Sequence, residues 1–116
     1  MNDCIFCKII ANEIPSEVIL ENDHIKVISD IHPKAPVHAL ILPKWKKHIS
    51  SVQDIAAGDK EVLIQMILAA QKVAALKKLK GYKLVFNVGR EGGQIIDHLH
   101  LHMLGGWSQP THEAHV

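Results

Sequence analysis

Three histidines alternate with apolar residues in the segment HLHLHML, residues 98–104 of the chain. Successive side chains of a β-strand point to opposite faces, so a strand here would present the three rings on one face. The leucines and the methionine between them would then pack on the core. The histidines concerned are His98, His100 and His102.

Two chemistries use such a face of imidazole rings. Histidines at positions i and i+2, with a third ligand, can hold a catalytic zinc ion. Alternatively, one ring can attack a phosphorus atom while its neighbours bind the phosphate oxygens. The interpretation without chemistry is a solvated strand that is rich in histidine.

A glycine-rich loop, NVGREGGQ at residues 87–94, leads into this segment. Glycines let backbone N–H groups approach an anion closely, and Gln94 would add a side-chain donor. Taken alone, such glycines are typical of a plain turn. Joined directly to a face of histidines, they favour a phosphate-binding site.

Cys4 and Cys7 form a C-x-x-C motif, for which three interpretations compete. They are half of a zinc site, a redox pair, or two inert buried thiols. The redox motif normally follows a strand, and none is predicted before Cys4. Half a zinc site needs two further ligands, and the chain has nine histidines, but the spacing alone does not identify them.

The elements that must position these groups follow from the apolar periodicity. A short helical turn is predicted within residues 4–15, and one long amphipathic helix from Asp59 to Leu79, with Asp59 as its N-cap and Gly81 just beyond its end. Strand patterns are predicted at residues 16–22, 24–30, 37–43, 82–88 and 94–104. This order, with its short connections, indicates an α+β domain with about five antiparallel strands and the long helix on one face.

The bulk properties exclude several classes of protein. A chain of 116 residues suits one domain, and its net charge of +1 with few aromatic residues argues against a nucleic-acid groove or a membrane-seeking face. No apolar run approaches the ~20 residues that span a bilayer. The N-terminus does not resemble a signal peptide, so we expect a cytoplasmic protein without a structural disulfide.

The segment HLHLHML resembles the signature of the histidine triad (HIT) superfamily of nucleotide hydrolases and transferases. The blocks CIFCKIIANEIP, SDIHPKAPVHALILPKWKKHIS and GYKLVFNVGREGGQ also look like those of its nucleotide-binding branch, in the same order. The resemblance covers the chain from about Asp3 to Gly106. It implies a single HIT domain at residues 1–106, followed by a C-terminal tail at residues 107–116.

The resemblance implies a homodimer with one nucleotide site per subunit. It also implies a reaction at the α-phosphate of AMP- or GMP-linked phosphoramidates. By position in the motif, His100 is the expected nucleophile, which forms a nucleotidyl-histidine that water hydrolyses. His102 would hold the phosphate or assist the leaving group, and His38 matches a fourth histidine that faces the triad.

The same resemblance assigns the remaining parts of the site. It implies that Asp30 binds the ribose hydroxyls, and that Ile31 and Leu40 surround the base. The phosphate side is assigned to Asn87, Gly93 and Gln94. It completes the C-x-x-C motif into a closed structural zinc site, one per subunit, whose ligands are Cys4, Cys7, His48 and His98.

Three positions depart from the family pattern. Ile95 stands where a serine that acts near the leaving group is usual, Asp97 where an aromatic residue or proline is common, and Trp107 where arginine is frequent. Ile95 keeps open a nucleotide-binding regulatory or interaction module with weak catalysis. A hydrolase of dinucleoside polyphosphates and a zinc hydrolase with metal on the three triad histidines also remain open.

Overall fold

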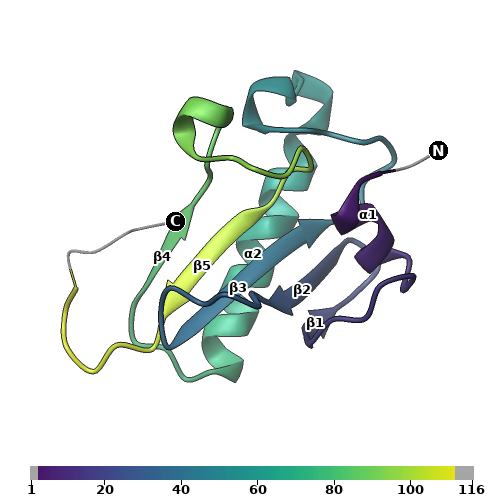
Figure 1. Cartoon of the computed structure of the whole chain (residues 1–116). Coiled ribbons are helices and arrows are strands. Elements are labelled where there is room, and N and C mark those ends of the chain that lie inside the picture. The colour runs from purple at the N-terminus through teal and green to yellow at the C-terminus, as the bar shows by residue number, and fades with distance from the viewer. Residues whose placement is uncertain (1–2, 112–116) are drawn as a thin grey trace.

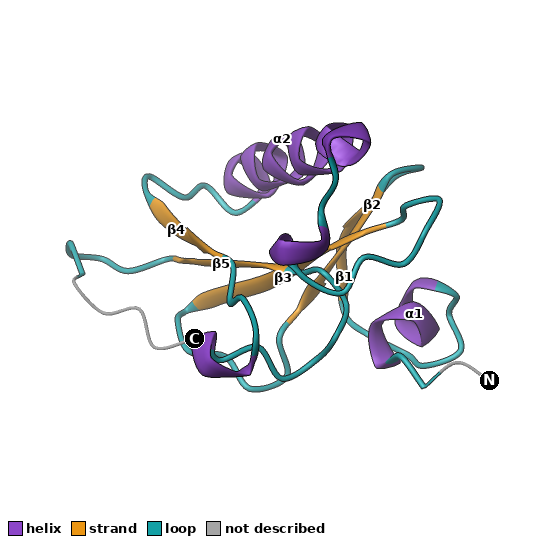
Figure 2. Ribbon diagram, turned by 90° about the horizontal axis from the view of Figure 1, so that it is seen from above, coloured by secondary structure: helices purple, strands orange, loops and turns teal. Residues whose placement is uncertain are grey.

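A five-stranded antiparallel sheet carries a long helix on one face and a short helix beside the other (Figures 1 and 2). The computed structural model describes residues 3–111, and its strand order is β1-β2-β3-β5-β4. The predicted α+β architecture is therefore confirmed.

Part of the predicted tail, residues 112–116, lies outside the described residues. The elements are α1 (Ile5–Ile10), β1 (Val18–Glu21), β2 (Ile25–Ser29), β3 (Val37–Pro43), α2 (Lys60–Leu76), β4 (Tyr82–Val85) and β5 (Leu101–Gly105), with 3₁₀ turns at Val52–Asp54, Ala57–Asp59 and Arg90–Gly92.

The long helix α2 buries one stripe of small and apolar side chains, spaced three and four residues apart. These side chains meet the sheet face formed by alternate residues of β2, β3 and β5. The stripe consists of Val62, Met66, Ala69, Ala70, Val73 and Ala74. None of the described helices is long and apolar enough to cross a bilayer.

The predicted start of α2 is confirmed, since Asp59 is its N-cap residue, but the predicted end at Leu79 is wrong. The helix stops at Leu76 because Lys78 adopts the left-handed conformation (φ 55°), a position usually taken by glycine. The Leu79 N–H then reaches back to the Ala74 carbonyl at 2.9 Å, and the Leu79 side chain packs on the core. At the other end, the Asp59 carboxylate makes no cap bond to α2 and instead accepts from the Ala56 N–H at 3.0 Å.

The last strand is shorter than predicted, because β5 begins only at Leu101. His98 and His100 therefore precede the strand. Pro43 ends β3 and cannot donate a ladder bond to the segment before β5. The Leu99 N–H donates to the Ile49 carbonyl at 2.8 Å, outside the sheet. The predicted alternation survives, since the residues between the histidines, Leu99, Leu101 and Met103, all lie in the core cluster under α2.

The second face of the sheet is also buried at β2 and β3, where α1 covers it (Figure 2). Phe6 and Ile9 of α1 pack there against Ile28, and the Leu40 and Leu42 side chains of β3 complete this second cluster. The neighbouring Lys26 of β2 is only 1% exposed. The strand alternation predicted for β2 is correct, but α1 makes its second face an interior one.

Candidate active site and metal centre

The three predicted catalytic histidines come together on the sheet face opposite α2. The register of β3 and β5 pairs Leu40 with His102, and His38 stands two residues before Leu40 on the same face. The ring centroids of His38 and His102 lie 5.2 Å apart, and those of His100 and His102 lie 5.0 Å apart. The fold thus assembles the histidine face that the sequence pattern predicts. Of His98, His100 and His102, however, only His102 lies within β5.

Hydrogen bonds assign the tautomers of His38 and His102. The Lys34 N–H donates to His38 Nδ1 at 3.0 Å, so the proton of the neutral His38 ring lies on Nε2. That Nε2 lies 2.9 Å from His102 Nδ1 and donates to it. The proton of His102 must then lie on its Nε2, and His102 acts as a hydrogen-bond donor at its far edge.

His100 has the complementary arrangement. Its Nδ1–H donates to the His98 carbonyl at 2.7 Å, so its Nε2 carries an unprotonated lone pair. Burial lowers the pKa of His100, and burial together with the charges of His100 and His38 lowers the pKa of His102 to about 4. Burial also lowers the pKa of His38, although Asp30 opposes the effect. Neutral rings near pH 7 give a nucleophilic nitrogen beside an N–H donor.

The residues predicted to hold the nucleoside differ in their accessibility. Asp30 follows β2, and its Oδ2 lies 3.5 Å from His38 Nε2. Its other oxygen accepts from the His32 N–H at 2.8 Å, which shapes the loop. The Ile31 side chain is 86% exposed, whereas Leu40 is 7% exposed. Ile31 is therefore free to contact a ligand, while Leu40 belongs to the cluster beneath α1.

The hydrogen-bond donors of the glycine-rich loop are satisfied within the loop and its neighbours. The N–H groups of Gly92, Gly93 and Gln94 bond to carbonyls within the loop, and the Gly89 N–H donates to Gln94 Oε1 at 3.0 Å. The Gln94 amide donates to the Ser50 and Ile96 carbonyls at 2.6 and 2.9 Å. These donors are used within the loop in this structure, and the phosphate role of Gly93 and Gln94 stays a prediction.

The loop also fixes the segment that leads into the histidines. Arg90 forms a two-pronged ion pair with Asp97, with both N–O distances at 2.8 Å, and also donates to the Gln94 carbonyl at 2.7 Å. The Asp97 carbonyl in turn accepts from His48 Nε2–H at 2.7 Å. The loop thereby positions one of the predicted zinc ligands.

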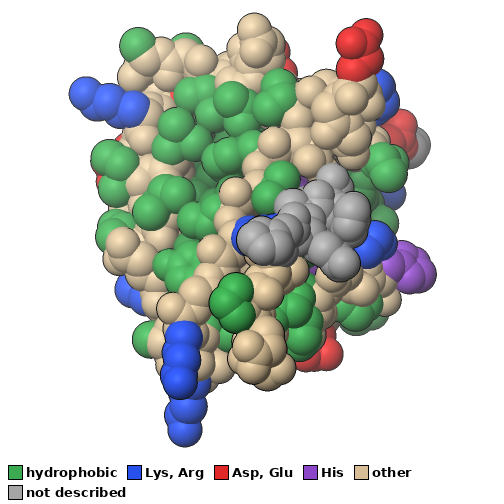
Figure 3. All heavy atoms as spheres, turned by 90° about the vertical axis from the view of Figure 1, so that its left-hand side faces the viewer, with side chains coloured by type: hydrophobic (Ala, Val, Ile, Leu, Met, Phe, Trp, Pro, Cys, Tyr) green, Lys and Arg blue, Asp and Glu red, His purple; other side chains and the backbone are tan. Residues whose placement is uncertain are grey.

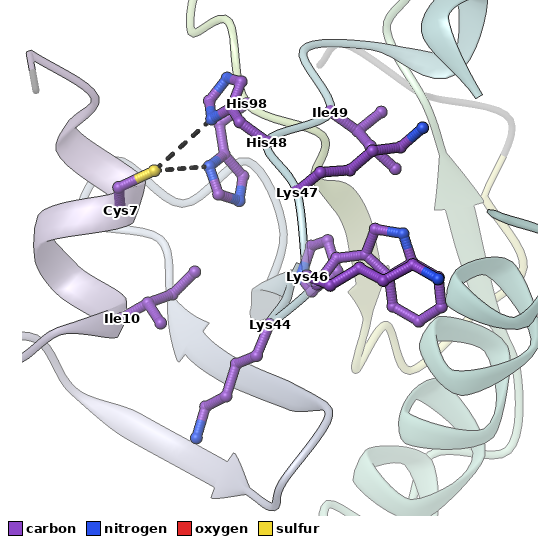
Figure 4. A pocket seen from close by; sticks show the side chains of 10 residues that line it. Cys7, Ile10, Lys44, Lys46, Lys47, His48, Ile49 and His98 are labelled. Atoms are coloured by element: carbon purple, nitrogen blue, oxygen red, sulfur yellow. Dashed lines mark hydrogen bonds between the residues drawn. The ribbon is translucent and has the colours of Figure 1, made fainter. Parts of the chain in front are cut away.

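The four predicted zinc ligands, Cys4, Cys7, His48 and His98, form one cluster. Figure 4 shows three of them, Cys7, His48 and His98. His98 Nδ1 lies 3.2 Å from Cys4 Sγ and 3.4 Å from Cys7 Sγ, and His48 Nδ1 lies 3.6 Å from Cys7 Sγ. Neighbouring ligand atoms around a tetrahedral zinc stand roughly 3.5 Å apart, given bond lengths of about 2.1–2.3 Å. Since His48 Nε2 donates to a carbonyl, its Nδ1 is free to bind a metal.

A second group of metal-ligand types, formed by Asp30, His38 and His102, is also compact. Its chemistry differs from that of the cysteine cluster. The Lys34 N–H occupies His38 Nδ1, so His38 Nε2 carries the proton and has no lone pair for a metal. The donor set therefore argues against metal at Asp30, His38 and His102 and fits zinc at the cysteines.

A cavity of about 450 Å³ borders the cysteine cluster (Figure 4). Its lining includes Cys7, His48 and His98 together with a row of lysines, but not His100 or His102. Two of those lysines are paired with carboxylates, Lys44 with Glu21 and Lys47 with Asp59. This cavity belongs to the surroundings of the metal cluster rather than to the nucleophile.

Sequence reasoning missed two groups that contact the histidines. Phe6, between the two cysteines, places its ring edge-on against His98 and His100, with centroid distances of 5.9 and 5.0 Å. The backbone N–H of Lys34 sets the tautomer of His38. A backbone donor has no signature in residue type, and only the position of Phe6 inside the C-x-x-C motif could have indicated its role.

Comparisons with known proteins agree with this geometry. The family model "Scavenger mRNA decapping enzyme C-term binding" matches residues 3–115. The purine nucleoside phosphoramidase of Escherichia coli K12 is 41% identical over 106 residues, which cover 90% of this chain and 87% of that protein. A HIT family hydrolase from Clostridium thermocellum has a TM-score of 0.88 at 42% identity, covering 97% of this chain and 99% of that one.

A zinc-bound histidine triad family protein from Mycobacterium smegmatis has the same fold, with a TM-score of 0.79 at 27% identity. The match covers 91% of this chain and 76% of that one. Taken together, the matches show that the chain belongs to the histidine triad superfamily and is one of its hydrolases.

Proposed function

We propose that this hydrolase cleaves purine nucleoside phosphoramidates at the α-phosphate through a nucleotidyl-histidine on His100. The observation that carries the proposal is the pairing of tautomers. His100 has a free lone pair on Nε2, and the neighbouring His102 has a proton on Nε2. The substrate class is supported by the 41% identical relative named purine nucleoside phosphoramidase.

In the first step, His100 Nε2 attacks the phosphorus atom and the P–N bond to the leaving amine breaks. The amine departs with a proton taken from His102 Nε2 or from a water molecule that His102 holds. In the second step, water attacks the phosphorus and the P–N bond to His100 breaks, which releases the nucleoside monophosphate. A covalent intermediate divides one slow displacement into two easier ones.

The other residues of the site bind the nucleotide in this proposal. Asp30 accepts hydrogen bonds from the ribose hydroxyls, and the exposed Ile31 side chain contacts the base. Asn87, Gly93 and Gln94 remain predictions for the phosphate side. The N–H of His102 stabilises charge on a non-bridging oxygen until it is needed by the leaving group.

Zinc is proposed as a structural ion held by Cys4, Cys7, His48 and His98. A closed set of four protein ligands leaves no position for substrate, so the ion would supply rigidity rather than Lewis acidity. The proposal is supported by the compact donor set and by the zinc-bound relative from Mycobacterium smegmatis. Because His98 stands two residues before His100, such an ion would hold the segment that carries the nucleophile.

A homodimer is proposed through the edge of the sheet. β4 is an edge strand, and apolar side chains gather on that side of the molecule (Figure 3). An edge strand beside exposed apolar residues favours association with a second copy. The exposed apolar residues of α2, β4 and the segment after β4 are Ile64, Ile67, Leu68, Leu76, Tyr82, Leu84 and Val88.

The proposal is tested with adenosine 5′-phosphoramidate as substrate and AMP release as the signal. The wild type should turn the substrate over, and His100→Ala should lose turnover by at least about 10³-fold while AMP binding in calorimetry changes little. Full activity of the alanine variant would refute the nucleophile. A wild type that binds AMP but hydrolyses no phosphoramidate would instead favour a regulatory binding module.

One observation favours the second function, a nucleotide-binding regulatory module. Ile95 stands at a position where related proteins usually have a serine, and its side chain is 82% exposed. Isoleucine has no hydroxyl to assist the departure of an amine. Assays with a dinucleoside polyphosphate in parallel separate a defect in amine departure from a general lack of catalysis.

A further inference from the structure

The ring of His100 is enclosed on both sides by other rings. Phe6 meets it edge-on with a centroid distance of 5.0 Å and an interplanar angle of 66°, and His102 does the same at 5.0 Å and 65°. The Nδ1–H bond to the His98 carbonyl fixes the third side. Phe6 is 5% exposed, so its own ring has little freedom. The direction of the His100 Nε2 lone pair therefore depends on where Phe6 stands.

Phe6 belongs to α1, a helix of six residues that is too short to be stable alone. Its N-terminal end is fixed at the cysteines, where Cys4 caps the helix by accepting from the Cys7 N–H at 3.2 Å. The same two cysteines belong to the proposed zinc site. The position of Phe6 between them connects the metal cluster to the His100 ring.

The other end of α1 is fixed by Lys26 of β2. Its ammonium group donates to the Ile9 carbonyl and to Asn12 Oδ1, both at 2.8 Å. A positive charge suits the C-terminal end of a helix, where carbonyl groups lack partners. Lys26 is 1% exposed, and burying an ammonium group is unfavourable unless it is hydrogen-bonded. These contacts define the position of the helix closely.

We propose that Phe6 is a positioning residue that holds the His100 ring in line for attack, and that Lys26 fixes the helix which carries it. The inference rests on the proposed function of His100. In this proposal Phe6 acts through the nucleophile, whose ring it contacts, rather than on the reacting phosphorus. Alignment of reacting atoms contributes strongly to rate, so loosening the ring should lower kcat and leave nucleotide binding nearly unchanged.

The kinetic test compares Phe6→Leu with Ile9→Ala. Both residues are buried on α1 in the same cluster, but Phe6 contacts the histidine rings, and the Ile9 side chain serves as the control. Phe6→Leu should lower kcat about 10-fold with KM changed less than about twofold. Ile9→Ala should lower the melting temperature and leave kcat within about twofold. Equal effects of the two variants on kcat would overturn the inference.

A second readout does not depend on turnover. In ¹⁵N and ¹³C spectra of the histidine rings, wild-type His100 should show a single Nδ1–H tautomer. Phe6→Leu and Lys26→Met should broaden or average the His100 signals, whereas Ile9→Ala and the exposed Lys72→Met should not. If wild type proves inactive, the proposed function fails but this arm still reports on the ring. Unchanged His100 signals in both Phe6→Leu and Lys26→Met would overturn the positioning role.

Discussion

His38 Nε2 lies 2.9 Å from His102 Nδ1, and the direction of this hydrogen bond is set by a third group. The Lys34 N–H occupies His38 Nδ1, so the proton must run from His38 toward His102. As a result, His102 carries its proton on Nε2, the ring nitrogen that does not face His38. A backbone amide thus determines what His102 can donate to a phosphate.

This relationship predicts the behaviour of His38→Ala. Without the donor, His102 is free to place its proton on either nitrogen, and kcat should fall about 10- to 100-fold while AMP affinity stays within about threefold. Steady-state kinetics and the ¹⁵N shifts of His102 measure the two effects. His38→Gln, whose amide can also donate, should restore part of the rate. A His102 ring that keeps its tautomer in His38→Ala would contradict the assignment.

Much of this site follows from the sequence because it depends on side-chain alternation. The period of two separates His98, His100 and His102 from the leucines even where no regular strand forms. What the sequence could not supply depends on backbone groups and distant packing. The Lys34 N–H has no signature in residue type.

The Gln94 amide donates to carbonyls at the base of the loop, which its residue type does not indicate, since the same side chain could equally well bind a phosphate. The end of α2 was missed for a related reason. Lys78 takes a left-handed conformation that residue type alone assigns to Gly81. Both features depend on hydrogen bonds and backbone conformations that residue type alone does not indicate.

The lowered pKa values predict an unusual pH profile. Burial shifts the pKa of His100 and of His102 downward from 6.5, so both rings stay neutral below the pH at which free histidine protonates. Lowering the pH protonates His100 Nε2 and removes its lone pair. Because burial lowers the pKa of His100, this loss requires a more acidic pH than for free histidine. We expect kcat/KM to stay level from pH 8 to below 6.5 and to fall only at more acidic pH. A fall centred at or above pH 6.5 would contradict this expectation.

The proposed zinc site predicts the effect of Cys7→Ser. Elemental analysis should give about one zinc per wild-type chain and much less in the variant, because four-ligand sites depend on each ligand. When the free zinc concentration is about a thousandfold the Kd, loss of zinc binding removes about 4 kcal/mol from the free energy of unfolding.

A chelator provides the control for this prediction. It should lower the melting temperature of wild type but not of Cys7→Ser, and His102→Ala should keep its zinc. Loss of zinc from His102→Ala with retention in Cys7→Ser would reverse the assignment of the metal site.

The proposed dimer predicts that a charge on β4 disrupts assembly. Leu84→Glu should shift the protein from dimer to monomer in light scattering at micromolar concentration, since an unpaired charge in an apolar interface is costly. Ile31→Glu is the matched control, because Ile31 is also exposed but follows β2 toward the opposite side of the sheet. A monomeric wild type, or a dimeric Leu84→Glu, would argue against this interface.

Asp59 predicts how stability depends on acid. Its carboxylate accepts from Trp45 Nε1 at 3.1 Å and from the Ala56 N–H at 3.0 Å, and it pairs with Lys47 at 2.9 Å. The hydrogen bond from Lys47, followed by those from Ala56 and Trp45, lowers the pKa of Asp59 to about 2 from 3.8. A carboxyl whose pKa is lower in the folded state stabilises the fold above its unfolded pKa.

The stabilisation by Asp59 should therefore be complete above about pH 4 and should disappear as pH falls toward 2. Asp59→Asn removes the charge at every pH, so it should unfold at lower denaturant concentration than wild type at pH 6. The two proteins should converge as pH approaches 2, which urea titrations over this range measure. Effects of acid on other groups cancel in the difference between the two proteins. A difference that stays constant from pH 6 to pH 2 would show that the Asp59 charge does not contribute, and that shape alone holds Trp45 and the turn before α2.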